Sequence, residues 1–123
     1  MASEHWKDEP EVQDFPAAKS FLSLLIGLDA AGKLVKDLRK GATLQHFAAK
    51  DILRAAGLAL LPADDSEVAA DLEKVKHGIK LSPVLLISGT PLWVADGYHR
   101  VCASYHLDEK EPVPARIAPR AKG

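Results

Sequence analysis

Residues Trp93 to Leu107 read WVADGYHRVCASYHL, and this stretch decides the fold. A short apolar run ends at the pair Asp96-Gly97, and a helical pattern begins at Tyr98. A glycine at such a position lets the backbone turn sharply, because it has no Cβ atom to restrict its conformation. The stretch therefore predicts a strand, a tight turn and a helix, in that order.

The predicted turn carries side chains suited to holding an anion. The first N–H groups of a helix have no partners within the helix, and the helix dipole adds partial positive charge there. Arg100 supplies a bidentate donor and His99 a titratable one. Asp96 can cap the helix or hold a histidine, a hydroxyl group or a metal ion. An ordinary cap at Asp96 with surface residues at His99 and Arg100 explains the turn equally well, so both interpretations stay open.

Two strands are predicted to form a hairpin before this turn. Val84–Ile87 is a continuous apolar run after Pro83, which is typical of a strand covered on both faces. Leu92–Ala95 follows after a short turn segment and is expected to pair with it. Downstream, apolar residues alternate from residue 113 to residue 117 and predict another strand. Pro112 and Pro114 would confine that strand to an edge of the sheet.

The first half of the chain is predicted to be helical. Asp14 caps the first helix, whose apolar face is formed by Ala18, Phe21, Leu22, Leu25 and Ile26. A second helix buries Leu34 and Leu38 and ends at Gly41. Thr43 caps a third, in which Leu44, Phe47, Ala48, Ile52 and Ala55 line one side before Gly57. Asp65 or Ser66 caps a fourth that ends at Gly78. Between these last two, Leu58–Leu61 is either a strand or core filling.

The organisation expected from this pattern is one α+β domain. Residues 1–13 are polar without a period and are expected to form a flexible arm. Residues 14–123 then form the domain, with no interdomain linker and no internal repeat. A helical segment precedes the strands in it.

Composition limits the function classes. Sixteen basic and seventeen acidic residues give a net charge of -1, so the charge balance argues against nucleic acid as a partner. A single cysteine, Cys102, fits a reducing compartment. The longest early apolar run, residues 21–28, is too short to span a bilayer, and the acidic N-terminus does not resemble a signal peptide. We therefore expect a cytoplasmic protein with no membrane partner.

The segment SPVLLISGTPLWVADGYHRVCASYHLDEKEPVPARI, residues 82–117, resembles the core of the ParB/sulfiredoxin-like superfamily, of the ParB-like nuclease domain type. The resemblance rests on the D-G-x-H-R-x-x-A turn, which here spans residues 96–103, and on the order of the flanking strands. It extends over residues 47–117 and leaves residues 14–46 as a helical extension. It implies a small mixed sheet with helices.

The resemblance also implies a ligand and the residues that hold it. In this superfamily the turn commonly contacts the phosphates of a nucleotide, so ATP or CTP with Mg²⁺ is the expected cofactor. Gly97, Tyr98, His99 and Arg100 occupy the phosphate-contacting turn, and Lys80 and Ser82 fall where they could line the same cleft. Asp96 matches an acid that lies close to the chemistry in the serine kinases of the superfamily, so Asp96 and His99 are the candidate catalytic residues.

Departures from the family patterns limit the reaction. Sulfiredoxins place their catalytic thiol just before the histidine, where this chain has Tyr98, and Cys102 does not replace it. Partition proteins add a helix-turn-helix domain and a dimerisation domain, for which this chain has no room. If the protein is an enzyme, nucleotide-dependent phosphoryl transfer is favoured over sulfiredoxin or nuclease chemistry.

Other readings remain. One alternative is a non-catalytic protein-interaction module, in which the helical first half carries the partner surface and the turn is only structural. A homodimer is also compatible with the sequence. DNA binding is the weakest alternative, because acids balance bases. His99, Cys102 and His106 have a spacing that suits zinc, but no fourth ligand is evident, so no metal site is predicted. Gly27–Lys33 has the glycine spacing of a phosphate loop but continues with Leu34, and is interpreted as a helix break.

Overall fold

The computed structural model describes residues 5–40 and 43–120, which form five helices and four strands. In chain order these are α1 (Asp14–Ile26), α2 (Leu28–Lys40), β1 (Leu44–Ala48), α3 (Ala49–Ala56), α4 (Ser66–Lys76), β2 (Val84–Ser88), β3 (Trp93–Asp96), α5 (Tyr98–Leu107) and β4 (Pro112–Pro119). The α+β class and the helical segment at the N-terminal side are confirmed.

The strands form one mixed sheet in the order β1-β4-β2-β3. The predicted hairpin is confirmed, since β2 and β3 pair antiparallel with Leu86 opposite Val94 and Ile87 opposite Trp93. Strand β4 pairs antiparallel with β1 and parallel with β2. The chain therefore leaves β2, passes through β3 and α5, and returns beside β2 as β4. This path places the start of α5 at the end of the edge strand β3.

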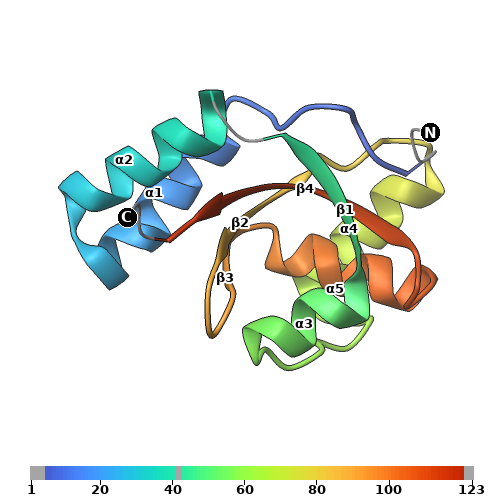
Figure 1. Cartoon of the computed structure of the whole chain (residues 1–123). Coiled ribbons are helices and arrows are strands. Elements are labelled where there is room, and N and C mark those ends of the chain that lie inside the picture. The colour runs from blue at the N-terminus through green and yellow to red at the C-terminus, as the bar shows by residue number, and fades with distance from the viewer. Residues whose placement is uncertain (1–4, 41–42, 121–123) are drawn as a thin grey trace.

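Helices cover both faces of the sheet (Figure 1). Alternate residues of β2 enter two separate cores: Val84 and Leu86 pack with α3, α4 and α5, while Leu85 and Ile87 pack with α1 and α2. All four side chains are buried, which confirms the prediction of a strand covered on both faces. The continuous apolar run follows from this position, because neither face of β2 meets water.

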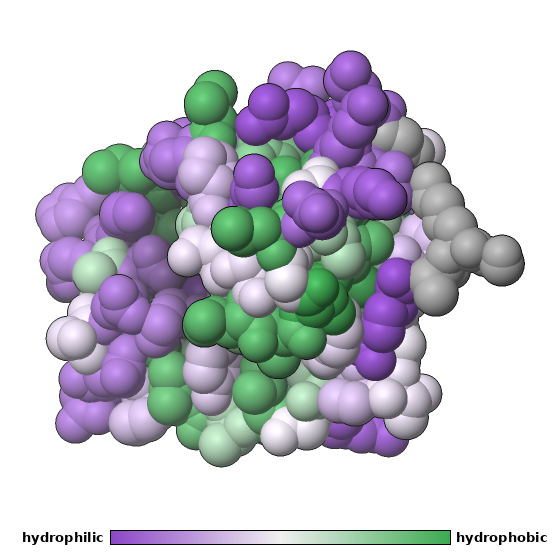
Figure 2. Space-filling model, turned by 90° about the vertical axis from the view of Figure 1, so that its left-hand side faces the viewer, coloured by the Kyte–Doolittle hydropathy of each residue, from purple (hydrophilic) through white to green (hydrophobic). Residues whose placement is uncertain are grey.

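Helix α1 has apolar residues on its outer side as well. It buries Phe15, Ala18 and Leu22 but leaves Phe21, Leu24 and Leu25 exposed. The junction between α1 and α2 lies on the left in Figure 1, and the face on that side, shown in Figure 2, carries a patch of hydrophobic side chains between polar regions. The apolar face predicted for this helix is therefore buried at Ala18 and Leu22 only, with Ile26 partly buried, and the prediction is wrong for Phe21 and Leu25.

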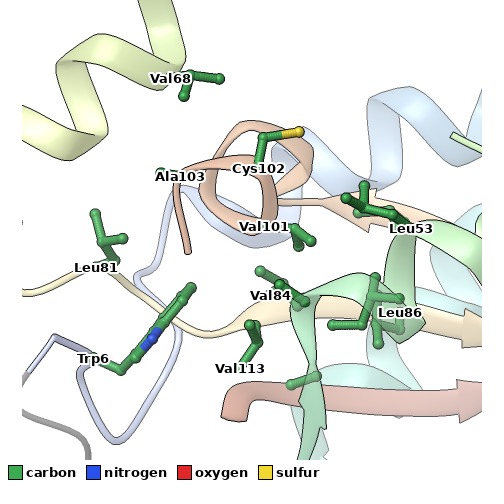
Figure 3. Packing of buried hydrophobic residues seen from close by; sticks show 14 residues of the cluster. Trp6, Leu53, Val68, Leu81, Val84, Leu86, Val101, Cys102, Ala103 and Val113 are labelled. Atoms are coloured by element: carbon green, nitrogen blue, oxygen red, sulfur yellow. The ribbon is translucent and has the colours of Figure 1, made fainter. Parts of the chain in front are cut away.

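The segment before α1 is part of the structure rather than a flexible arm. Trp6 is only 2% exposed and packs in the core beside Leu81, as Figure 3 shows. Its neighbours form a short bridge, in which Lys7 N donates to Leu81 O and Leu81 N to His5 O, both at 2.8 Å. The prediction for residues 1–13 is therefore wrong from residue 5 onward, because the polar sequence conceals one buried indole. Residues 1–4 lie outside the described part.

The third predicted helix begins too early. Leu44–Ala48 is strand β1, paired with β4 from Leu44 opposite Arg116 to Ala48 opposite Pro112, and Thr43 does not cap a helix. Pairing with β4 overrides the helical spacing of the apolar residues. The helical extension predicted for residues 14–46 accordingly ends at Lys40, while Gly41 lies outside the described residues. Leu58–Leu61 is loop and not strand.

Strand β4 is not at an edge of the sheet, contrary to the prediction from its prolines. It lies between β1 and β2, and its pairing with β2 begins only at Ala115. Pro112 and Pro114 come before that point, so their missing N–H groups remove no bond to β2. An internal strand therefore tolerates prolines in the half that has a neighbour on one side only.

The predicted cap of the fourth helix is confirmed, whereas that of the first is wrong. The Asp65 side chain caps α4, accepting hydrogen bonds from Glu67 N and Val68 N at 3.2 Å each. Asp14 is the first residue of α1 rather than its cap, and the cap position, Gln13, makes no side-chain cap hydrogen bond. Gly27 separates α1 from α2, as expected of a helix break. Among the described residues, no helix is long and apolar enough to cross a membrane.

Candidate functional site

The turn between β3 and α5 depends on Gly97. This residue has a φ of 108°, which side-chain-bearing residues rarely adopt, and it occupies the position just before α5 without a side-chain cap. A Cβ atom built here would collide with the Val84 side chain and lie 2.9 Å from Arg100 Nη2. The glycine therefore brings the helix start against β2 and against the Arg100 guanidinium.

The Arg100 guanidinium lies within a polar cluster. Nη2 donates to Asp96 Oδ2 at 2.9 Å, and Nη1 donates to the Ser82 hydroxyl group and approaches Asp14 Oδ1 at 3.4 Å. The side chain is 15% exposed, and its Nε atom has no hydrogen-bond partner among the described residues. Arg100 thus ties together α1, the lead-in to β2 and the end of β3. The sequence suggests that the Arg100 guanidinium is free to donate to a phosphate, whereas in the structure it already donates to neighbouring side chains.

The Asp96 carboxyl group has an unusual environment for an acid. Burial raises its pKa to about 6, and the nearby Asp14 carboxylate acts in the same direction, while Arg100 opposes both. The group can therefore gain and lose a proton close to neutral pH. A side chain with this property is suited to general acid–base work.

His99 is the second residue of α5 and faces α4. Its Nε2 atom is 2.8 Å from Glu67 Oε2, and its side chain is 38% exposed. The preceding residue, Tyr98, donates its hydroxyl hydrogen to Ala59 O and so attaches the loop after α3 to α5. The two ring centroids are only 5.5 Å apart, with His99 Nε2 directed to α4 and the Tyr98 hydroxyl group to the loop.

A cleft of about 370 Å³ opens beside these residues, between the segment before α1, helix α4, residues 79–82 and the start of α5. We call it the charged cleft. Three of its four lysine and arginine side chains are paired with acids: Lys7 with Glu11 at 2.6 Å, Lys74 with Asp71 at 3.9 Å, and Arg100 as above. Lys80 is exposed and forms no ion pair with the described residues. It is the cation that remains available to a ligand.

All of the residues predicted to form the phosphate site line the charged cleft: Lys80, Ser82, Asp96, Gly97, Tyr98, His99 and Arg100. The sequence does not reveal the other walls. The sequence predicts only a cap at Asp14, yet this residue lies 86 positions before Arg100 and its carboxylate approaches the guanidinium. Lys7 and Lys74 come from segments with no motif, and only the fold brings them to the cleft. The burial of Asp14, which points to a partner for its carboxylate, is visible only in the structure.

The residues with zinc-like spacing do not converge. His99 faces Glu67, whereas His106 Nε2 lies 2.7 Å from Leu61 O. Cys102 is fully buried in the core between them, and burial raises the pKa of its thiol. The described part of the chain contains no group of three or more His, Cys, Asp or Glu side chains that could hold a metal ion. The raised pKa also opposes a nucleophilic role for Cys102.

Comparison with known proteins adds no assignment. No protein-family model matches the chain, and neither the curated proteins nor the solved structures yield a match. The function must therefore be argued from the site itself.

Proposed function

We propose that the charged cleft binds a nucleotide or another phosphorylated small molecule at the start of α5. The observation that carries the proposal is Lys80, an exposed cation without an ion-pair partner among the described residues, in the same cleft as the Gly97 turn and His99. Phosphate binds well where a lysine and the first N–H groups of a helix point to one place. Lys80, the turn amides and His99 would make the contacts.

The charges of the cleft favour a phosphate that carries Mg²⁺. Five acids line the cleft beside its four lysine and arginine side chains: Glu11, Asp14, Glu67, Asp71 and Asp96. A bare polyphosphate would meet more carboxylates than lysine and arginine side chains. Mg²⁺ is usually held by one or two carboxylates together with phosphate oxygens, so the absence of a three-ligand group in the described residues is compatible with it. Asp96 is the acid nearest to the turn that would hold the phosphate.

The family resemblance supports the same ligand class. The D-G-Y-H-R turn at residues 96–100 lies between a strand and a helix, the setting in which ParB/sulfiredoxin-like proteins contact nucleotide phosphates. On this proposal Asp96 and His99 are the residues closest to any chemistry. The pKa of Asp96, about 6, suits a proton acceptor in phosphoryl transfer at neutral pH. Arg100 would position Asp96 rather than bind phosphate directly.

Calorimetric titration of the full chain with ATP, CTP and ADP, with and without Mg²⁺, tests the proposal. At least one nucleotide should bind, more tightly with Mg²⁺, and Lys80→Ala should weaken binding by about tenfold through loss of one charge-assisted contact. Lys76→Ala is the matched control, because this lysine is exposed but does not line the cleft. The Lys76→Ala variant should bind the nucleotide with the affinity of the wild type.

Two results would contradict the proposal. One is no binding of any of the three nucleotides in the presence of Mg²⁺. The other is an equal effect of Lys80→Ala and Lys76→Ala, which would indicate nonspecific attraction to surface charge. Arg100→Ala is a poor first variant, because removing Arg100 leaves two carboxylates and a hydroxyl group without their partner.

The alternative function, a protein-interaction module, is supported by the exposed apolar residues of the helical first half. Leu24 is 85% exposed and Leu28 is 68% exposed, although both are leucines next to a packed core. Large exposed apolar groups can mark an interaction surface. This alternative predicts no nucleotide binding and normal folding of His99→Ala, so the same titration separates the two functions.

A further inference from the structure

A second cleft, of about 390 Å³, adjoins the same turn. We call it the apolar cleft. It lies between α1, the end of α3 and strand β3, and its large apolar side chains include Phe21, Leu58, Leu92 and Trp93. Its walls are mainly hydrophobic, in contrast to the charged cleft. Pockets of this size and character commonly hold the apolar part of a small molecule.

The two clefts meet at the start of α5. Four consecutive residues, Asp96, Gly97, Tyr98 and His99, line both of them. A single ligand that contacts these residues can therefore extend into either cleft. Charged groups are available in one direction and apolar side chains in the other.

The apolar cleft retains hydrophobic surface that the fold does not use. Helix α1 packs inward through residues such as Ala18 and Leu22, while Phe21 and Ala17, one turn apart, face the apolar cleft. Phe21 remains 41% exposed and Leu58 37% exposed. Both side chains line the apolar cleft, Phe21 from α1 and Leu58 from the loop after α3. Covering such surface at a concave site favours binding of an apolar group.

From these features we infer that the ligand of the charged cleft carries a flat apolar or aromatic group, which occupies the apolar cleft against Phe21 and Leu58. This inference rests on the proposed function, because the phosphate end must lie in the charged cleft. The occupant is one molecule with two chemically different ends, and residues 96–99, which line both clefts, would contact it between those ends. A phosphate compound without an apolar group would leave the apolar cleft in contact with water.

The test compares methyl phosphate with 1-naphthyl phosphate in the presence of Mg²⁺, each titrated into the ¹⁵N-labelled full chain and followed by NMR. Naphthyl phosphate should bind at least about tenfold more tightly, because it buries a ring that methyl phosphate lacks. Phe21→Ala should remove most of that preference while leaving the affinity for methyl phosphate unchanged. Leu24→Ala, on the same helix but outside both clefts, is the matched control and should bind like the wild type.

The outcomes separate this inference from the proposed function. If neither compound binds, the proposed function fails and the inference fails with it. If both bind with equal affinity, or Phe21→Ala and Leu24→Ala behave alike, the inference alone is overturned. Sedimentation velocity covers a further possibility: a dimer that Phe21→Ala dissociates would assign the apolar cleft to a second copy of the chain and also overturn the inference. A monomer with naphthyl-selective, Phe21-dependent binding supports it.

Discussion

The Asp96 carboxyl group is held between a guanidinium and a second carboxylate. Arg100 donates to both Asp96 and Ser82, and Asp14 approaches the same guanidinium from α1. One arginine charge thus faces two acids, and burial keeps water from compensating the difference. A proton on Asp96 relieves the excess negative charge. The site therefore combines a fixed cation with an acid that changes charge near neutral pH.

Replacing Asp96 with asparagine tests this arrangement. The folded protein keeps the Asp96 proton up to about pH 6, whereas an unfolded chain loses it near pH 4, because the pKa is raised mainly by burial. Ionisation between these values therefore disfavours the folded state. The wild type should therefore lose about 1 kcal/mol of its free energy of unfolding, relative to Asp96→Asn, between about pH 4 and about pH 7. This figure is smaller than the pKa shift alone would give, because the Asp96 carboxyl group is partly exposed to solvent. Urea unfolding of both proteins at each pH measures it, and a constant difference would show that Asp96 titrates normally.

Among the helices, α4 has the clearest local signal for where it begins. The Asp65 side chain satisfies two N–H groups of its first turn, at Glu67 and Val68. Asp65→Ala should lower the free energy of unfolding by about 1 kcal/mol, since that is the usual cost of losing such a cap. Asp64→Ala, which removes an exposed neighbouring acid, is the control and should change stability by less than about 0.5 kcal/mol. Equal losses in the two variants, measured by urea unfolding, would contradict the capping role.

Local signals predicted most of these segments, and the failures share one cause. The strands of the hairpin, α4 with its cap, and α5 after Gly97 follow from short patterns in the sequence. Leu44–Ala48 has helical spacing, yet it pairs with β4, a partner about seventy residues later. Likewise, the residues of the turn could be named from the motif, whereas Asp14 reaches Arg100 only through packing of α1. Contacts between distant segments leave no periodic signal in one sequence.

The chain as one body has two cores that share the sheet. One lies under α1 and α2, and the other lies among α3, α4, α5 and the segment before α1. Trp6 belongs to the second core, and the residues that follow it form a wall of the charged cleft. The segment before α1 therefore contributes Trp6 to the core and, from Lys7 onward, side chains to the wall of the charged cleft.

Trp6→Ala tests how much the fold depends on this segment. Removal of a fully buried tryptophan should cost about 3 kcal/mol or more in the free energy of unfolding, because it leaves a cavity. Trp6→Phe should lose less, since it keeps part of the ring volume. Val12→Ala, at an 80% exposed position of the same segment, should stay within about 0.5 kcal/mol of the wild type. Thermal and urea unfolding measure all three, and a neutral Trp6→Ala would mean that the segment docks without stabilising the core.

The buried thiol of Cys102 has a practical consequence. It is the chain's one cysteine, it is fully covered by the core, and burial raises its pKa. An alkylating reagent can reach the sulfur only when the core opens, and each reacted molecule records one such opening. Mass spectrometry after a brief pulse of reagent therefore counts the opened chains directly, from the mass that one alkylation adds. Cysteines introduced on the surface for spectroscopic probes would react first and could be modified selectively in the native protein.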